Sequence, residues 1–89
     1  MTHVHASHPD IVKRLKRANG HLQKIIDMID QGKSCLDVAQ QLQAVYNAVG
    51  NAKKVFVQDH IEGCLDGESN SPAELKAMMK EVREISKYL

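Results

Sequence analysis

The chain has 89 residues, of which 43% are hydrophobic and 26% are charged, and its formal net charge is +1. A chain of this length holds at most one small domain, and a single domain over residues 1–89 is expected. A net charge near zero neither favours nor excludes binding to nucleic acid. No apolar run approaches the roughly 20 residues of a membrane span, and the N-terminus lacks signal-peptide character. We therefore expect a cytoplasmic protein with no membrane partner.

The first residues are rich in histidine. The segment "HVHASH" carries His3, His5 and His8 just before the first predicted helix. Residues 1–7 are expected to form a flexible tail, in which these histidines would have no particular role. The other interpretation is that one of them supplies a nitrogen ligand to a metal, because the start of the first helix should lie near the end of the second in a bundle.

Three segments begin with the same pattern, a serine followed three residues later by a carboxylate. They are "SHPD" at 7–10, "SCLD" at 34–37 and "SPAE" at 71–74. This spacing is typical of a capping box, in which the two side chains satisfy free N–H groups in the first turn of a helix. The prolines of the first and third segments stand where a first helical turn tolerates them.

Apolar residues after each start recur at steps of three and four, which is the period of a helix. One stripe runs from Ile11 to Ile29 and a second from Val38 to Phe56. No stretch alternates with period two, so no strand is expected. The pattern predicts an all-α chain of three helices, at about 8–30, 35–65 and 72–88.

The second predicted helix is too long for the others to cover. At 1.5 Å per residue it spans roughly 45 Å, and a shorter first helix and a short third helix leave much of it bare. The simplest remedy is an antiparallel dimer, in which the first two helices of each chain form a four-helix bundle. The third helix would then cap the ends or mediate assembly into a tetramer.

The stretch "DHIEGC" at 59–64 places His60 and Cys64 on one helix face. Imidazole and thiolate suit soft or borderline metals, but two ligands are too few. The other cysteine, Cys35, lies roughly 37 Å away along the same helix. In an antiparallel dimer, Cys35 of one subunit would meet His60 and Cys64 of its partner. The alternatives are a small buried cysteine and a histidine that complements the helix dipole.

The segments "RLKRANGHLQKI", "AVYNAVGNA" and "VFVQDHIEGC", with Cys–His–Cys spacings of 25 and 4, resemble the copper-sensitive operon repressor (CsoR) family. This family of bacterial repressors includes nickel/cobalt-responsive (RcnR-like) and formaldehyde-responsive (FrmR-like) members. The resemblance covers nearly the whole chain and implies a helical dimer, commonly paired into a tetramer. By position, Cys35, His60 and Cys64 match the copper-sensing ligands, which implies a trigonal Cu(I) site with two thiolates and one imidazole.

The resemblance leaves a second metal open. His3 matches the fourth ligand of nickel-sensing members, where two sulfurs and two nitrogens suit Ni(II), and Ser34 stands where copper members often carry tyrosine. Cu(I) is therefore favoured, with Ni(II) or Co(II) as the alternative. Formaldehyde sensing is not favoured, because those members have proline at position two and lack the last cysteine, whereas this chain has Thr2 and Cys64.

Basic residues gather near the start of the first helix and again in the middle of the second, with no helix-turn-helix or zinc-finger pattern. By themselves they are typical of a solvated helix face. The resemblance implies instead that Arg14 and Arg17 contact operator DNA, through basic surfaces that meet phosphates. The candidate DNA-binding residues are Lys13, Arg14, Lys16, Arg17, Lys53 and Lys54.

These observations together predict a metal-responsive repressor. The metal-free protein would bind double-stranded operator DNA, and Cu(I) at the intersubunit site would release it. Glu81, on the third helix, is a candidate to contact the ligands and so to sense their ligation. The alternatives are a Ni(II)- or Co(II)-responsive repressor and a metal-buffering protein without a DNA role. An enzyme is not expected, because no nucleophile, base and acid form a set.

Overall fold

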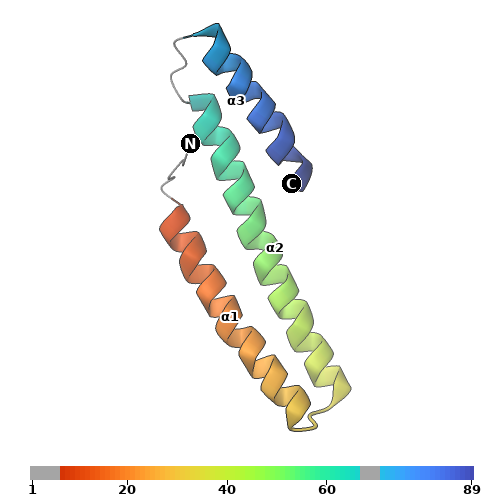
Figure 1. Ribbon diagram of the computed structural model, residues 1–89. Coiled ribbons are helices and arrows are strands. Elements are labelled where there is room, and N and C mark those ends of the chain that lie inside the picture. Colours follow the sequence, from red (N-terminus) through yellow and green to blue (C-terminus); the bar gives the residue numbers. More distant parts are fainter. Residues whose placement is uncertain (1–6, 67–70) are drawn as a thin grey trace.

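The computed structural model of the chain describes residues 7–66 and 71–89 (Figure 1). It contains the helices α1 (His8–Asp30), α2 (Cys35–Asp66) and α3 (Pro72–Ile85), followed by the 3₁₀ turn η1 (Ser86–Tyr88). The described residues contain no strand. The expected all-α fold is confirmed, and the three helices begin and end within a few residues of the boundaries that the sequence predicts.

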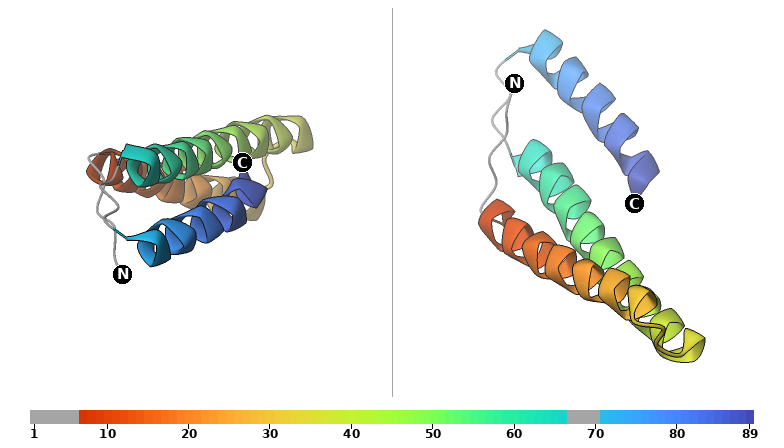
Figure 2. Two further views of the ribbon diagram at one scale, coloured as in Figure 1. Left: turned by 90° about the horizontal axis from the view of Figure 1, so that it is seen from above. Right: turned by 60° about the horizontal axis from the view of Figure 1, so that its bottom comes forward.

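The molecule is a rod. α1 and α2 form an antiparallel hairpin, and α3 returns along the C-terminal part of α2 (Figures 1 and 2). The principal extents are 60 × 22 × 16 Å and the radius of gyration is 18.0 Å. A compact chain of this length would have a radius of gyration of about 12 Å. One chain therefore covers only part of its own helices.

The turn between α1 and α2 follows from local sequence. Gly32 has a φ of +72°, the left-handed conformation that glycine adopts without penalty. Behind it, the N–H of Lys33 donates to the carbonyl of Met28 at 3.0 Å, which is the hydrogen bond of a Schellman motif. Ser34 then caps α2, because its hydroxyl accepts from the N–H of Asp37 at 3.1 Å. The chain is thus turned back within a few residues.

The three expected capping boxes have two outcomes. Ser71 caps α3 as Ser34 caps α2, since its hydroxyl accepts from the N–H of Glu74 at 3.1 Å. At Ser7 the expectation is wrong. Its backbone is already helical and its side chain makes no capping bond; the hydroxyl donates instead to the carboxylate of Asp59 on α2. The side chain of Ser7 therefore contacts α2 instead of the first turn of α1. A capping bond would require an extended backbone at Ser7.

The core of the single chain is a narrow seam between helices. Its residues are small or β-branched and recur about every seven positions on α1, so α1 contributes only about one side chain for every two turns. Ile25 is the most deeply buried large residue, at 1% exposure. The buried apolar residues of the described chain are Ile11, Ala18, Ile25, Val45, Ala52 and Val57.

The other members of the two apolar stripes remain exposed. Leu15 and Leu22 on α1 are 44% and 42% exposed, and Leu42 and Val49 on α2 are 44% and 43% exposed. These residues alternate along each helix with the buried ones, so each stripe has one row in the seam and one row outside it. We call the outer row the apolar face. A continuous exposed row of this kind marks an interaction surface.

We expect the apolar face to hold copies of the chain together. Val49→Lys would place a charge in that interface and should weaken self-association by at least about 3 kcal/mol, or roughly 100-fold in the dissociation constant. Sedimentation velocity over a range of protein concentrations measures the change. Gln40→Lys adds the same charge at another exposed position of α2 and is the control. Equal association of the two variants would contradict this role for the apolar face.

Candidate metal centre and nucleic-acid interface

The predicted metal ligands lie at the two ends of α2. The helix is continuous from Cys35 to Asp66, so Cys35 and His60 are held about 37 Å apart. Cys35 is exposed, with a free thiol, in the first turn. Within the part of the chain that the structure describes, no three residues among His, Cys, Asp and Glu are grouped so that they could hold a metal. One chain therefore does not bring Cys35 and His60 together.

Two predicted ligands fall outside the description. Cys64 belongs to the backbone of α2, one turn beyond His60, but its side chain lies outside the described residues. His3 lies outside them as well, as does His5. His8 is described: it is the first residue of α1, and its ring stacks on that of Phe56 with centroids 5.1 Å apart.

His60 is buried at the junction of α2 and α3, with 8% of its surface exposed. Its Nε2 lies 3.0 Å from Oε1 of Glu81, on α3. Because a carboxylate only accepts hydrogen bonds, this contact requires the proton on Nε2. In a neutral imidazole of that tautomer, Nδ1 is the acceptor nitrogen. The contact thus fixes the orientation of the ring.

The start of α1 is attached to the same part of α2. Ser7 donates to Asp59, the residue next to His60, and His8 stacks on Phe56, one turn earlier. Ile11, in the first turns of α1, is 4% exposed. Both α1 and α3 therefore meet α2 near His60. The sequence suggests nothing of the Ser7 contact, because a serine at a helix start has a local explanation.

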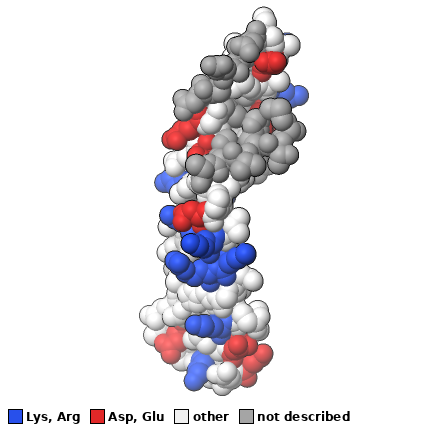
Figure 3. All heavy atoms as spheres, turned by 90° about the vertical axis from the view of Figure 1, so that its left-hand side faces the viewer, with Lys and Arg blue, Asp and Glu red and all other residues white. Residues whose placement is uncertain are grey.

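A basic hollow runs between α1 and α2 on one side of the hairpin. Figure 3, which looks onto α1, shows Lys and Arg gathered at mid-length of the rod. Within the hollow, Nε of Arg14 donates to Asp10 at 2.9 Å, an exposed i,i+4 pair that steadies the guanidinium. The lining residues are Asp10, Lys13, Arg14, Arg17, Ala18, His21, Ala48 and Asn51.

The predicted DNA-binding residues separate into groups. Lys13, Arg14 and Arg17 line the basic hollow, whereas Lys53 lines a different hollow beside Tyr46. Lys16 and Lys54 are exposed and line neither.

Several residues of the hollow are absent from the sequence prediction, among them His21 and Asn51. His21 is one turn beyond Arg17, and its Nε2 donates to the side-chain oxygen of Gln41 on α2 at 2.5 Å. The helical spacing from Arg17 could have indicated it. Asn51 joins from α2, and only the register of α1 against α2 could have placed it there.

The basic hollow and the apolar face lie on opposite sides of the hairpin. On α1, Arg14 and Arg17 are on one side of the buried seam and Leu22 is on the other, as the helical period requires. On α2, Ala48 and Asn51 of the hollow lie on one side of the buried seam and Leu42 and Val49 lie on the other, as the same period requires. Self-association through the apolar face would leave the basic hollow open.

Comparison with known proteins now bears on this arrangement. A family model described as a metal-sensitive transcriptional repressor matches residues 7–89. The chain belongs to this family. The CsoR-type resemblance is thereby confirmed, and so is the expectation that the protein is not an enzyme, because the family consists of transcriptional regulators.

Curated relatives are named as copper sensors. The copper-sensing transcriptional repressor CsoR of Mycobacterium ulcerans (strain Agy99) is 42% identical over 53 residues, covering 60% of this chain and 45% of the relative. CsoR of Mycobacterium tuberculosis (strain H37Rv) is 34% identical over 68 residues, covering 71% and 57%. The chain spans about half the length of the curated relatives it matches.

Two solved structures share the fold. The nickel-responsive transcriptional regulator InrS has a TM-score of 0.78 and 23% identity, with both chains covered in full. A variant of the formaldehyde-responsive regulator FrmR from Salmonella enterica serovar Typhimurium has a TM-score of 0.81 and 24% identity, covering 99% of this chain and all of that one. At these identities the likeness shows the fold alone. Among the described residues, no helix has the length and apolar character needed to cross a membrane.

The His60–Glu81 contact can be tested through stability. Glu81→Ala removes the acceptor from a buried N–H, which should cost about 1 kcal/mol in the free energy of unfolding, because water reaches the half-exposed carboxylate and replaces part of the bond. Glu84→Ala, at an exposed position of the same helix, should cost less than about 0.5 kcal/mol. Urea unfolding of both variants at one protein concentration gives the comparison. Equal losses would mean that the contact stabilises nothing.

Proposed function

We propose that the protein is a transcriptional repressor that binds double-stranded operator DNA in its metal-free form and releases it when it binds Cu(I). Family membership supports the class of function. One observation supports a metal sensor above the others. α2 has a buried histidine, His60, which Glu81 orients, near one end, and the exposed thiol of Cys35 at the other end. A repressor acts where its operator is, so we assign the protein to the cytoplasm.

The metal site requires two copies of the chain. In an antiparallel dimer built on the apolar face, the start of one α2 lies beside the end of the other. Cys35 of one protomer then completes a site with His60 and Cys64 of the partner subunit, giving two symmetric sites per dimer. Pairing of dimers would make the tetramer that the resemblance implies. Without self-association the proposed site does not exist.

The donor set favours Cu(I). Two thiolates and one neutral imidazole suit a soft ion that accepts three ligands, and the curated relatives are named as copper-sensing repressors. The second candidate is a Ni(II)- or Co(II)-responsive repressor, in which His3 adds a nitrogen. Anaerobic Cu(I) and Ni(II) affinities of the wild type and of His3→Ala separate the two. Only the Ni(II) site should weaken when His3 is removed.

The DNA-contacting surface in this proposal is the basic hollow. Lys13, Arg14 and Arg17 would meet phosphates, where each contact contributes affinity without reading sequence. Asn51 and His21, which line the same hollow, have side chains that can donate to or accept from the DNA. Lys16, Lys53 and Lys54 would add to the positive field around it.

Coupling between metal and DNA is carried, in this proposal, by the attachment of α1 near His60. Ligation would hold His60 and its turn of α2 in one position. Asp59 would transmit that position to Ser7, the residue just before α1, and the next turns of α1 carry Asp10 and Arg14. Metal releases DNA only if the two positions differ in affinity for each ligand, and typical coupling is 5- to 150-fold.

A binding experiment tests the whole proposal. Fluorescence anisotropy under anaerobic conditions, at fixed moderate salt, should show operator binding that Cu(I) weakens at least about 10-fold. His60→Ala should bind operator as the wild type does in the absence of metal and should lose the response. Release of operator DNA from that variant by Cu(I) would contradict the proposed role of His60 as a metal sensor. If no form binds DNA while Cu(I) binds tightly, the protein is a metal buffer instead.

The coupling route has its own test. Ser7→Ala should leave metal-free operator affinity and Cu(I) affinity each within about threefold, while the ratio of operator affinities with and without Cu(I) falls toward one. Ser86→Ala is a matched control, because its hydroxyl donates to a carbonyl within the same turn, that of Arg83, at 2.8 Å. An unchanged ratio in Ser7→Ala would show that the signal takes another route.

A further inference from the structure

The side chains of α3 are sorted into separate faces. Met78, Val82 and Ile85 are partly buried on the side that packs on α2, Glu74 and Glu81 lie in another sector, and Glu84 borders the cations. The three cations of α3 are spaced by four and three residues, which places them within an arc of about 60° at 3.6 residues per turn, and a fourth cation follows in η1. We call them the α3 stripe: Lys76, Lys80, Arg83 and Lys87.

The α3 stripe is exposed and carries uncompensated charge. All four side chains are exposed, and none forms an ion pair with a carboxylate of the described residues. The stripe borders one shallow hollow, whose other lining residues are Ala73, Ala77 and Glu84. Only Glu84 brings negative charge to it, so the surface is clearly positive. The small alanine side chains let a ligand approach the helix backbone.

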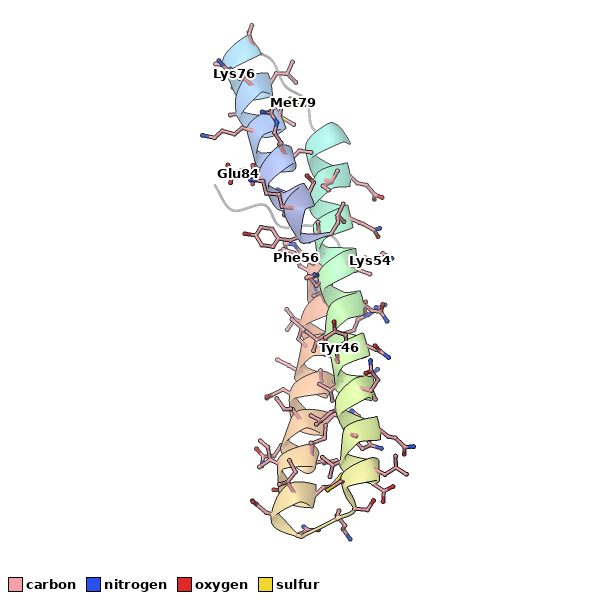
Figure 4. All side chains as sticks on the ribbon, turned by 90° about the vertical axis from the view of Figure 1, so that its right-hand side faces the viewer. Tyr46, Lys54, Phe56, Lys76, Met79 and Glu84 are labelled. Atoms are coloured by element: carbon pink, nitrogen blue, oxygen red, sulfur yellow. The ribbon has the colours of Figure 1, made fainter. Side chains whose placement is uncertain are left out.

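This surface is separate from the basic hollow. The hollow belongs to α1 and α2, and its lining includes no residue of α3. Figure 4 shows α3 beside the C-terminal part of α2, with Lys76 near its start and Glu84 near its end. The α3 stripe is therefore a second basic surface on a rod 60 Å long. The role proposed for Arg14 and Arg17 does not account for it.

We propose that the α3 stripe is a second contact with DNA, one that binds phosphates of the duplex and reads no sequence. The four cations extend over about 16 Å of helix axis, a length over which duplex DNA presents about ten phosphate charges. Three of the four are lysines, which bind phosphate as point charges and lack the bidentate geometry that recognises bases. The inference rests on the DNA-binding role proposed above.

Salt dependence measures this contact directly. Each phosphate contact steepens the fall of log K with log salt concentration by about 0.9. Lys76→Gln/Lys80→Gln should flatten the slope by about 1.8 and lower affinity several-fold at physiological salt. The loss should be equal on operator and on unrelated duplex, because phosphates carry no sequence information. Glutamine is as good a helix former as lysine, so α3 should persist.

The control removes the same kind of charge elsewhere. Lys33→Gln alters the exposed α1–α2 turn, at the far end of the rod from α3 (Figure 1), and its slope is compared with that of the single variant Lys80→Gln. A slope change only in Lys80→Gln supports the inference. Equal changes would mean that net charge alone acts, and no change would mean that α3 does not touch DNA; either result overturns it. If wild-type protein fails to bind operator, the proposed function falls as well.

Discussion

α2 is one unbroken helix of 32 residues, and its rigidity governs what the molecule can do. A helix of that length holds its first and last turns far apart, so Cys35 and His60 cannot share a ligand within one chain. The narrow seam between α1 and α2 leaves the apolar face uncovered as well. An antiparallel second copy would resolve both the separation of the ligands and the exposure of the apolar face. It would bury the row that contains Leu42 and Val49, and it would place its own Cys35 beside His60.

The two sides of the α1–α2 hairpin carry different surfaces, one apolar and one basic. A seven-residue recurrence of small and β-branched residues gives a thin seam, which leaves one row of apolar side chains free on one side. On the other side, the same helical period collects Arg14, Arg17 and His21. Because the two sets lie on opposite sides, assembly through the apolar face and the DNA contact proposed for the basic hollow would not compete for surface. The amphipathic pattern of α1 would thus serve two partners.

Local rules predicted the elements well. Ser34 and Ser71 cap their helices as the sequence indicates, Gly32 turns the chain with its positive φ, and the steps of three and four gave the helix boundaries. These features depend on neighbours within a few residues, which a sequence pattern records.

The sequence failed where distant segments meet. It could not tell which row of each stripe is buried, and it assigned the Ser7 hydroxyl to a cap although Asp59 takes it. Glu81 could be named as a candidate but not placed, because its contact with His60 depends on how α3 returns along α2. Register between helices is what the sequence lacks.

The turn of α2 around His60 is the point where these distant contacts converge. Glu81 attaches α3 to the imidazole itself, and Asp59 attaches the start of α1 through Ser7. A change in the position of this turn would act on both helices. α1 carries the basic hollow and α3 carries a second positive stripe, so ligation at one histidine would displace both proposed DNA contacts together. Displacing two contacts multiplies their separate losses of affinity, because free energies of independent contacts add. A small movement at one buried ring could therefore release the repressor from DNA.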